Sequence, residues 1–176
     1  MKKIFIILLI AYTAIGTSGK ILAGDKEIHD ESFKFSLVLP SGWTQKDVKE
    51  TEAKDGISYS FTKDDTTCSI MLLAFKLTAV KNLDDFVYTI EKDASLNIPT
   101  KDGDYILGDA NYFDWKIAYY KDLLAVEKIY YFRTKEPDAP NNFVYVMRFI
   151  TDKIHNSDAL RSQISKIADS FVPTPQ

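Results

Sequence analysis

The sequence predicts an α+β domain built on a central, mostly antiparallel sheet of about seven strands with two main helices. Two segments, Cys68–Phe75 and Phe143–Ile150, are apolar on both faces, which is typical of strands covered from both sides. Short turns separate the expected strands, which indicates antiparallel pairing. Two other segments carry a single apolar stripe at helical spacing and predict helices that lie on a core.

The chain opens with a segment that has the organisation of a secretory signal peptide. Lys2 and Lys3 form a positive head, residues 4–15 are apolar, and residues 16–19 are small or polar. The apolar run is shorter than the roughly 20 residues that a membrane-spanning helix needs. We therefore expect a signal peptide over residues 1–24, cleaved between residues 19 and 24, and a periplasmic or extracellular protein. An uncleaved N-terminal anchor is the alternative.

Residues 25–176 are expected to form a single domain, because no repeat, low-complexity tract or linker divides them. Cleavage after Gly24 would leave 152 residues, and loss of the three leader lysines would change the formal net charge from −3 to −6. A mildly acidic protein has no electrostatic footprint for nucleic acid or an anionic membrane. We expect neither nucleic-acid binding nor stable membrane insertion after signal cleavage. Cys68 is the single cysteine, so no intramolecular disulfide can form.

The first part of the expected domain contains one clear strand. Residues 25–31 are polar and are expected to be a loose lead-in, whereas Phe33–Leu39 alternates and predicts a strand with one buried face. A Pro-Ser-Gly corner ends this strand. Trp43 is expected to fold back over the edge of the core, and residues 44–56 are charged and turn-like.

A hairpin and a helix follow. Residues 57–62 and 67–77 flank a polar turn, and Cys68 is expected to be a small buried hydrophobe. The helix begins after Asn82, a suitable N-cap, and ends before Pro99. Its apolar stripe consists of Leu83, Phe86, Val87, Ile90 and Ala94.

A block of aromatic-rich strands and a second helix complete the chain. The strands are expected at residues 104–113, 115–121, 125–134 and 143–151, with a turn-rich loop at 136–142. Asn156 or Ser157 caps the second helix and Pro173 ends it. Its apolar stripe consists of Leu160, Ile164, Ile167, Ala168 and Phe171.

The chain resembles the PsbP/Mog1/DcrB-like family of small exported proteins in its element order over residues 30–173. The segment Phe35–Trp43, which ends in Leu-Pro-Ser-Gly-Trp, is the most recognisable part of the resemblance. The resemblance implies an α/β/α sandwich. It also implies an accessory or binding role, since the family is functionally mixed and shares no catalytic motif. The lipid-bearing cysteine of the lipoprotein members is missing here.

The residues offer no recognisable catalytic, cofactor or metal site. His29 and His155 are the two histidines, and Cys68 has no positive neighbour in sequence that would stabilise a thiolate. No Cys/His pair has metal-ligand spacing, and the seven glycines are dispersed. Arg133 and Arg148 interrupt apolar strands and are expected to pair with acids. We expect no enzyme, no cofactor and no metal; a hydrolase that uses His155 or Cys68 is a further alternative.

Aromatic density is the feature that points most to binding. Trp115 and Tyr119 are expected on one face of their strand and Tyr120 on the other. Exposed aromatic side chains suit contacts with a ligand or a partner protein. The alternative is that they form cross-strand pairs that stabilise the sheet. The candidate partner or ligand surface consists of Trp43, Trp115, Tyr119, Tyr120 and Tyr130.

These observations favour a non-enzymatic exported accessory or binding protein whose partner is another envelope protein or a small ligand. The alternative is a carrier that holds a small apolar ligand in a pocket between the sheet and a helix.

Overall fold

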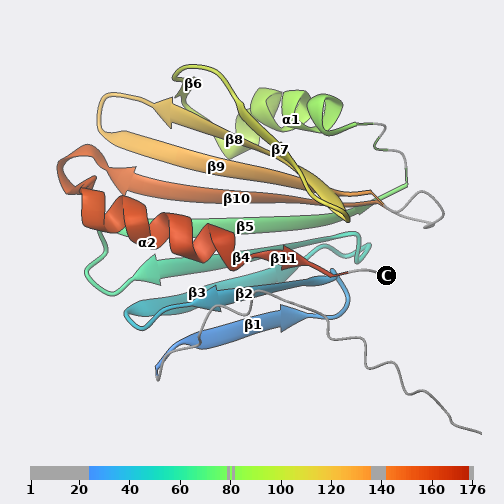
Figure 1. The fold of residues 1–176 in the computed structure, drawn as a ribbon, viewed down its shortest axis with the longest axis horizontal. Coiled ribbons are helices and arrows are strands. Elements are labelled where there is room, and N and C mark those ends of the chain that lie inside the picture. Colours follow the sequence, from blue (N-terminus) through green and yellow to red (C-terminus); the bar gives the residue numbers. More distant parts are fainter. Residues whose placement is uncertain (1–23, 79, 81, 136–141, 175–176) are drawn as a thin grey trace, which may run out of the picture.

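Two antiparallel sheets and two α-helices make up the described part of the computed structural model, which covers residues 24–78, 80, 82–135 and 142–174. The main sheet has eight strands in the order β3-β4-β5-β10-β9-β8-β6, with β7 also paired to β8 (Figure 1). The small sheet has the order β1-β2-β11. The predicted signal peptide, except Gly24, and the predicted loop at 136–142, except Asn142, lie outside the described residues.

All neighbouring strands pair antiparallel. The strands of the main sheet are β3 (Trp43–Glu50), β4 (Gly56–Lys63), β5 (Cys68–Leu77), β6 (Thr100–Lys101), β7 (Ile106–Asp109), β8 (Phe113–Lys121), β9 (Ala125–Thr134) and β10 (Asn142–Asp152). Those of the small sheet are β1 (Lys26–Asp30), β2 (Phe35–Leu39) and β11 (Val172–Pro173). The helices are α1 (Leu83–Lys92) and α2 (Asp158–Asp169), with short 3₁₀ turns η1 (Ala94–Leu96) and η2 (Lys153–His155).

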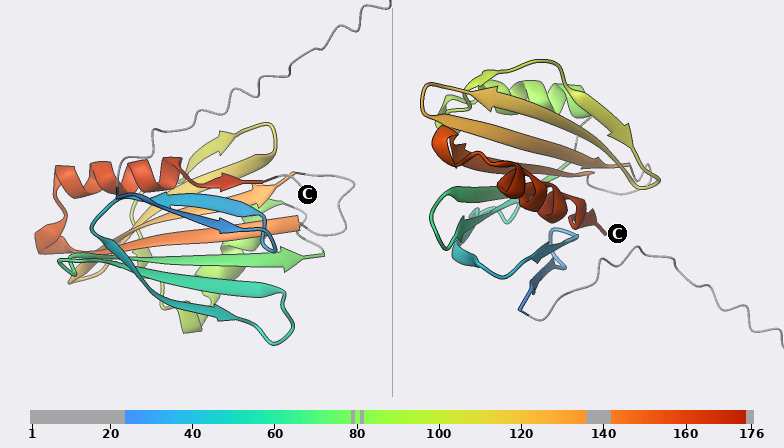
Figure 2. Two further views of the ribbon diagram at one scale, coloured as in Figure 1. Left: turned by 90° about the horizontal axis from the view of Figure 1, so that it is seen from below. Right: turned by 60° about the vertical axis from the view of Figure 1, so that its left-hand side comes forward.

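The main sheet is covered on both sides, so the predicted central antiparallel sheet between helices is confirmed. We call the side that packs against α2 and the small sheet the front face, and the side that packs against α1 the back face. Two separate apolar cores result, one on each face. Figure 2 shows the separation of α2 and α1 by the main sheet from two further directions.

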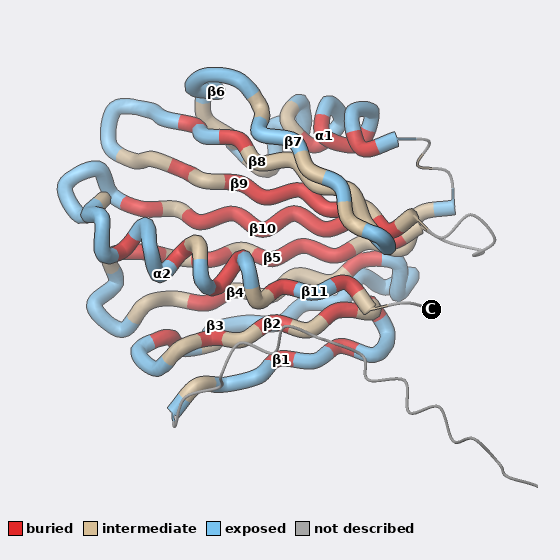
Figure 3. Tube along the Cα trace, in the orientation of Figure 1, coloured by how far each residue is buried: buried red, intermediate tan, exposed pale blue. Residues whose placement is uncertain are grey.

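Strand β10 lies between β5 and β9 and is buried along most of its length (Figure 3). Its alternate residues enter the two cores, as predicted: the front core receives Phe143, Tyr145, Met147 and Phe149, and the back core receives Val144 and Val146. The predicted stripe of α2 is buried in the front core, and four of the five stripe residues of α1 are buried in the back core. Ala94, the fifth, lies in η1 beyond the helix.

Several segment predictions were wrong, and edge position explains them. Residues 26–30 form β1 and not a loose lead-in, and residues 43–50 form β3 and not a turn. Both strands lie at sheet edges, and β3 contains an irregularity between Gln45 and Asp47 that interrupts the period of two. Of the strand expected at 104–113, only β7 forms as such. The main sheet has eight strands, close to the expected number of about seven.

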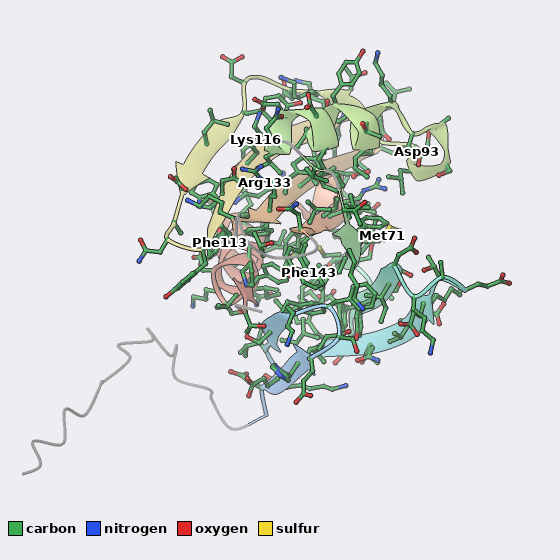
Figure 4. The ribbon with its side chains drawn as sticks, turned by 90° about the vertical axis from the view of Figure 1, so that its right-hand side faces the viewer. Met71, Asp93, Phe113, Lys116, Arg133 and Phe143 are labelled. Atoms are coloured by element: carbon green, nitrogen blue, oxygen red, sulfur yellow. The ribbon has the colours of Figure 1, made fainter. Side chains whose placement is uncertain are left out.

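The end of the molecule that faces the viewer in Figure 4 shows how the layers are joined. Lys116 lies on the back face and forms an ion pair with Asp84 in the first turn of α1. Arg133 also lies on the back face and pairs with Asp114 at 2.7 Å, which confirms the acid pairing predicted for it. Within the described residues, no helix is long and apolar enough to span a membrane.

Candidate functional site

Strand β9 directs two consecutive charged residues to opposite faces of the main sheet. Glu127 points to the back face and is buried, and Lys128 points to the front face and is half-buried. Alternation along an extended strand forces this separation. The two charges are therefore surrounded by different layers of the molecule.

On the back face, Glu127 is paired by Arg148 on β10, and the two side chains are only 5% and 4% exposed. Arg148 donates to the carboxylate through Nε at 3.0 Å and through Nη2 at 2.9 and 3.1 Å. Its Nη1 donates to the carbonyl of Leu96 in η1 at 2.7 Å. Burial raises the pKa of the Glu127 carboxyl, and the Arg148 guanidinium opposes that shift. The acid pairing predicted for Arg148 is confirmed, and the pair joins β9, β10 and η1.

A second polar group on the back face lies between α1 and β8. Tyr120 and Tyr105 both donate to the carboxylate of Glu91, Tyr105 at 2.6 Å, and the hydroxyls of Tyr120 and Tyr131 are 3.0 Å apart. Burial is the largest cause that raises the pKa of all three phenols, so they are neutral at physiological pH. These side chains satisfy one another inside the core.

The front face contains a pocket of about 380 Å³ between α2 and the ends of β8, β9 and β10. We call it the front pocket. Its volume lies within the range of roughly 300–1,000 Å³ that is usual for small-molecule sites. Residues from both the sheet and the helix line it, including Tyr119, Lys121, Val126, Lys128, Phe149 and Ile164.

Lys128 is the notable polar residue of the front pocket. Its Nζ lies 3.3 Å from the Ser165 hydroxyl and over the rings of Tyr130 and Tyr119, at 4.8 and 5.6 Å from their centroids. No carboxylate of the described residues forms an ion pair with it. Burial lowers the pKa of Lys128, but the neighbouring hydroxyls of Tyr130 and Tyr119 outweigh burial and the net pKa is raised. Lys128 is therefore a cation at neutral pH.

The other two cations that line the front pocket are already paired. Lys121 forms an ion pair with Asp102 at 2.7 Å. Arg161 pairs with Asp158 and donates to the carbonyl of Asn156 at 2.7 Å. Among the described residues around the pocket, Lys128 thus supplies the uncompensated positive charge.

Beyond the front pocket, three large apolar side chains stand exposed on two adjacent loops. We call Leu123, Leu124 and Ile154 the apolar tip; they are 90%, 79% and 88% exposed. The loops are the β8–β9 connection, which carries Leu123 and Leu124, and the β10–α2 connection, in which Ile154 lies in η2; both are at the left-hand end of Figure 1. A more open hollow of about 530 Å³, lined in part by residues 97–100, lies beside Leu123.

Hydrogen bonds hold the two loops of the apolar tip together. The backbone N–H of Lys153 donates to the carbonyl of Leu124 at 2.9 Å, and Lys153 Nζ donates to the carbonyl of Leu123 at 3.2 Å. The Asp122 carboxylate accepts from the backbone N–H groups of Leu124 and Ala125, both at 2.7 Å. The N–H of Ala125 and then that of Leu124 are the largest causes that lower the pKa of Asp122. The exposed side chains are presented on an ordered backbone.

The five predicted surface aromatics are spread over both cores. Tyr119 lines the front pocket and is 41% exposed, whereas Tyr120 is 1% exposed and belongs to the back core. Tyr130 is buried beside Lys128, and Trp43 is buried at the start of β3. Trp115 is half-buried against the front core and covers Gly108 on the neighbouring strand, where an added Cβ would lie 1.9 Å from the ring. The structure thus brings Tyr119 and Tyr130 together around Lys128.

Sequence reasoning missed Lys128 and the apolar tip. Two consecutive leucines inside the polar turn Lys121–Leu124 were a usable signal, because a turn has no core in which to bury them. Lys128 gave no signal of its own, since a lysine in an alternating strand is ordinarily a solvated residue. Whether a described carboxylate pairs with it depends on the tertiary structure.

The two candidate nucleophilic or basic residues lie in unlike surroundings. Cys68 is buried, as predicted, and burial raises the pKa of its thiol, which opposes thiolate formation. His155 is exposed, with Nδ1 3.6 Å from Asp152. The residues that the structure describes contain no cluster of three or more His, Cys, Asp or Glu that could hold a metal ion.

No protein-family model matches the sequence, and no curated protein matches it. Solved structures do match. Cyanobacterial PsbP (CyanoP) from Synechocystis sp. PCC 6803 superposes with a TM-score of 0.58 at 14% identity, over 90% of this chain and 98% of that one. The Ran-binding protein Mog1p of Saccharomyces cerevisiae gives 0.53 at 12% identity, over 85% and 95%. The chain has the PsbP/Mog1-like fold.

A third structure with this PsbP/Mog1-like fold comes from Mycobacterium tuberculosis. LpqN, described as involved in cell envelope biogenesis, gives a TM-score of 0.51 at 16% identity, over 86% of this chain and 91% of that one. None of the three is described as an enzyme; Mog1p is described by the protein that it binds. The predicted PsbP/Mog1 likeness is confirmed at the level of the fold, which by itself does not specify an activity.

Proposed function

We propose that the chain is a non-enzymatic, exported accessory protein of the cell envelope that binds another protein through the apolar tip. The single observation that carries this proposal is the exposure of Leu123, Leu124 and Ile154 on hydrogen-bonded loops. Neighbouring apolar side chains that are almost fully solvated, with polar residues around them, are typical of protein interaction sites.

The surroundings of the apolar tip favour a protein partner over a lipid surface. Lysines and acids alternate around it, among them Lys121, Asp122, Asp152 and Lys153. Binding to an anionic membrane requires an excess of basic residues, and a mixed polar rim around an apolar centre instead suits a protein interface. A mature domain with a formal charge of −6 adds to this preference.

Export to the periplasm or beyond rests on the leader sequence and is supported by the comparisons. The positive head and short apolar run precede β1, which begins at Lys26, so cleavage between residues 19 and 24 leaves every described strand intact. LpqN is described as taking part in cell envelope biogenesis, and Mog1p as binding a protein. Both descriptions are compatible with an envelope protein that works by binding.

A site-specific photo-crosslinker tests the docking proposal in the producing cells. We expect the crosslinker at position 123 to give one defined adduct, and the same adduct to disappear when Ile154→Asp is added. Position 107 is the matched control, because Leu107 is also an exposed leucine, at 65%, but lies on β7 away from the tip. Equal adduct formation at 107 and 123, or no loss with Ile154→Asp, would contradict the proposal.

Binding of the crosslinked protein, once purified, gives the quantitative form of the test. We expect the combined Leu123→Ser and Ile154→Ser variant to bind at least about tenfold more weakly, because truncation of central interface residues costs more than about 1 kcal/mol each. Its free energy of unfolding should change little, since both side chains are exposed.

The front pocket favours a second candidate function, that of a carrier for a small ligand. It lies between the sheet and α2 and has an apolar floor formed by Phe149 and Ile164. Such pockets in the interior of a layered fold are common small-molecule sites. The carrier and docking functions use neighbouring but different residues, so they can be tested separately.

A further inference from the structure

We propose that the front pocket binds a small monocarboxylate with an apolar body, whose carboxylate pairs with Lys128. This inference rests on the carrier function proposed above and specifies the chemical class of its ligand.

Among the described residues, the front pocket contains one positive charge that no carboxylate pairs with. Lys121 is compensated by Asp102 and Arg161 by Asp158, and Glu127, whose side chain is on the back face, is compensated by Arg148. Lys128 remains, with neutral hydroxyls, those of Ser165, Tyr130 and Tyr119, as its polar neighbours. A ligand with a single negative charge neutralises the pocket, whereas a dianionic phosphate would leave one charge uncompensated in a half-buried site.

The geometry around Lys128 leaves it suited to bind a carboxylate. The ammonium group has three donors, and its polar neighbours, the hydroxyls of Ser165 at 3.3 Å, Tyr130 and Tyr119, are all neutral. The rings of Tyr119 and Tyr130 lie beside the group and restrict its position. Half-burial strengthens a charge-assisted hydrogen bond relative to one in open water.

The front pocket is lined by apolar residues as well as by polar ones such as Asp102, Thr151 and Asn156. Phe149 is 1% exposed and Ile164 is 4% exposed, and Val126 adds a third aliphatic surface. Ile117 and Ile106 lie on the same front face, in register with Tyr130 and with each other. Apolar surface therefore continues along β8 from the charged end of the pocket. An amphipathic ligand, with one charged end and an apolar body, matches this arrangement.

Calorimetric titration of the mature protein with octanoate tests the proposal, with octan-1-ol and octylamine as uncharged and cationic probes of the same length. We expect octanoate to bind at least about tenfold more tightly than either. Lys128→Met should weaken octanoate binding by at least about tenfold, and Lys128→Arg should retain most of it, because the positive charge and a long flexible side chain are kept. Lys166→Met is the matched control, since Lys166 is an exposed lysine of α2 outside the pocket lining.

The outcomes separate this inference from the function on which it rests. Equal binding of octanoate and octan-1-ol would overturn the carboxylate assignment and leave the carrier function standing. If no probe binds to a correctly folded protein, both are overturned, and the docking function of the apolar tip is unaffected. An equal loss with Lys166→Met and Lys128→Met would also overturn the proposal, because the effect would then come from overall charge.

Discussion

Glu127 and Lys128 are adjacent in β9, and a comparison of their surroundings distinguishes the back face of the main sheet from the front face. On the back face, Arg148 and the Leu96 carbonyl complete a hydrogen-bonded group that is closed to solvent. On the front face, Lys128 lines a pocket of about 380 Å³ and forms no ion pair with a carboxylate of the described residues. The Glu127 carboxylate links β9, β10 and η1 through Arg148. The Lys128 ammonium is placed to pair with an anionic group from outside the chain.

The same contrast holds for the aromatic residues. On the back face, the hydroxyl of Tyr120 donates to Glu91 and lies 3.0 Å from the hydroxyl of Tyr131. Front-face Tyr119 is partly exposed and lies beside Lys128. A hydroxyl or charge whose partners are internal stabilises the fold, whereas one left partly solvated in a concave site is available for recognition. Aromatic density alone did not distinguish these two uses.

The largest effect is expected when the back-face pair is broken. Arg148→Met leaves Glu127 buried without its cation and removes the bond to Leu96, so we expect a loss of about 3–5 kcal/mol in the free energy of unfolding. Urea denaturation followed by circular dichroism measures it. The double variant Glu127→Leu with Arg148→Met should recover much of the loss, because no unpaired charge remains buried. If Arg148→Met were as stable as the parent protein, the Glu127–Arg148 pair would not be structural, and the proposed difference between the back and front faces would be contradicted.

A much smaller effect on stability is expected on the front face. Lys128→Met removes a cation that has no internal carboxylate partner and keeps a side chain of similar length, so the free energy of unfolding should change by less than about 1 kcal/mol. The same urea experiment provides the comparison with Arg148→Met. A loss of several kcal/mol would show that Lys128 is structural, and the front and back charges would then be alike.

The central part of the fold was predictable from the sequence, because β5 and β10 are apolar on both faces and the helices carry single stripes. The edge strands β1 and β3 were not, since an edge strand with few buried side chains lacks the period of two on which the prediction depends. Alternation placed Glu127 and Lys128 on opposite faces. Which one finds a partner depends on the register of β9 against β10 and on the position of α2, and both are tertiary properties.

The apolar tip shows a further limit of sequence reasoning. Leu123 and Leu124 lie in a turn, where leucine is unexpected, but Ile154 lies about thirty positions later and adjoins them only because Lys153 bonds to the carbonyls of that turn. A surface assembled from two connections is visible only after the strands are paired. The five aromatic candidates were selected by residue type, and the pairing placed them in different layers.

Ligand binding in the front pocket around Lys128 is what would most clearly distinguish the front face from the back face. The direct measurement is a titration of the ¹⁵N-labelled mature protein with octanoate, followed by ¹H–¹⁵N correlation spectra. We predict saturable shifts concentrated at the backbone amides of Tyr119, Lys128 and Ser165, and in Lys128→Met we predict that the shifts of Tyr119 and Ser165 need at least about tenfold more octanoate. Shifts confined to the back face or to the β3 edge, or no saturable shifts in the folded protein, would contradict this prediction.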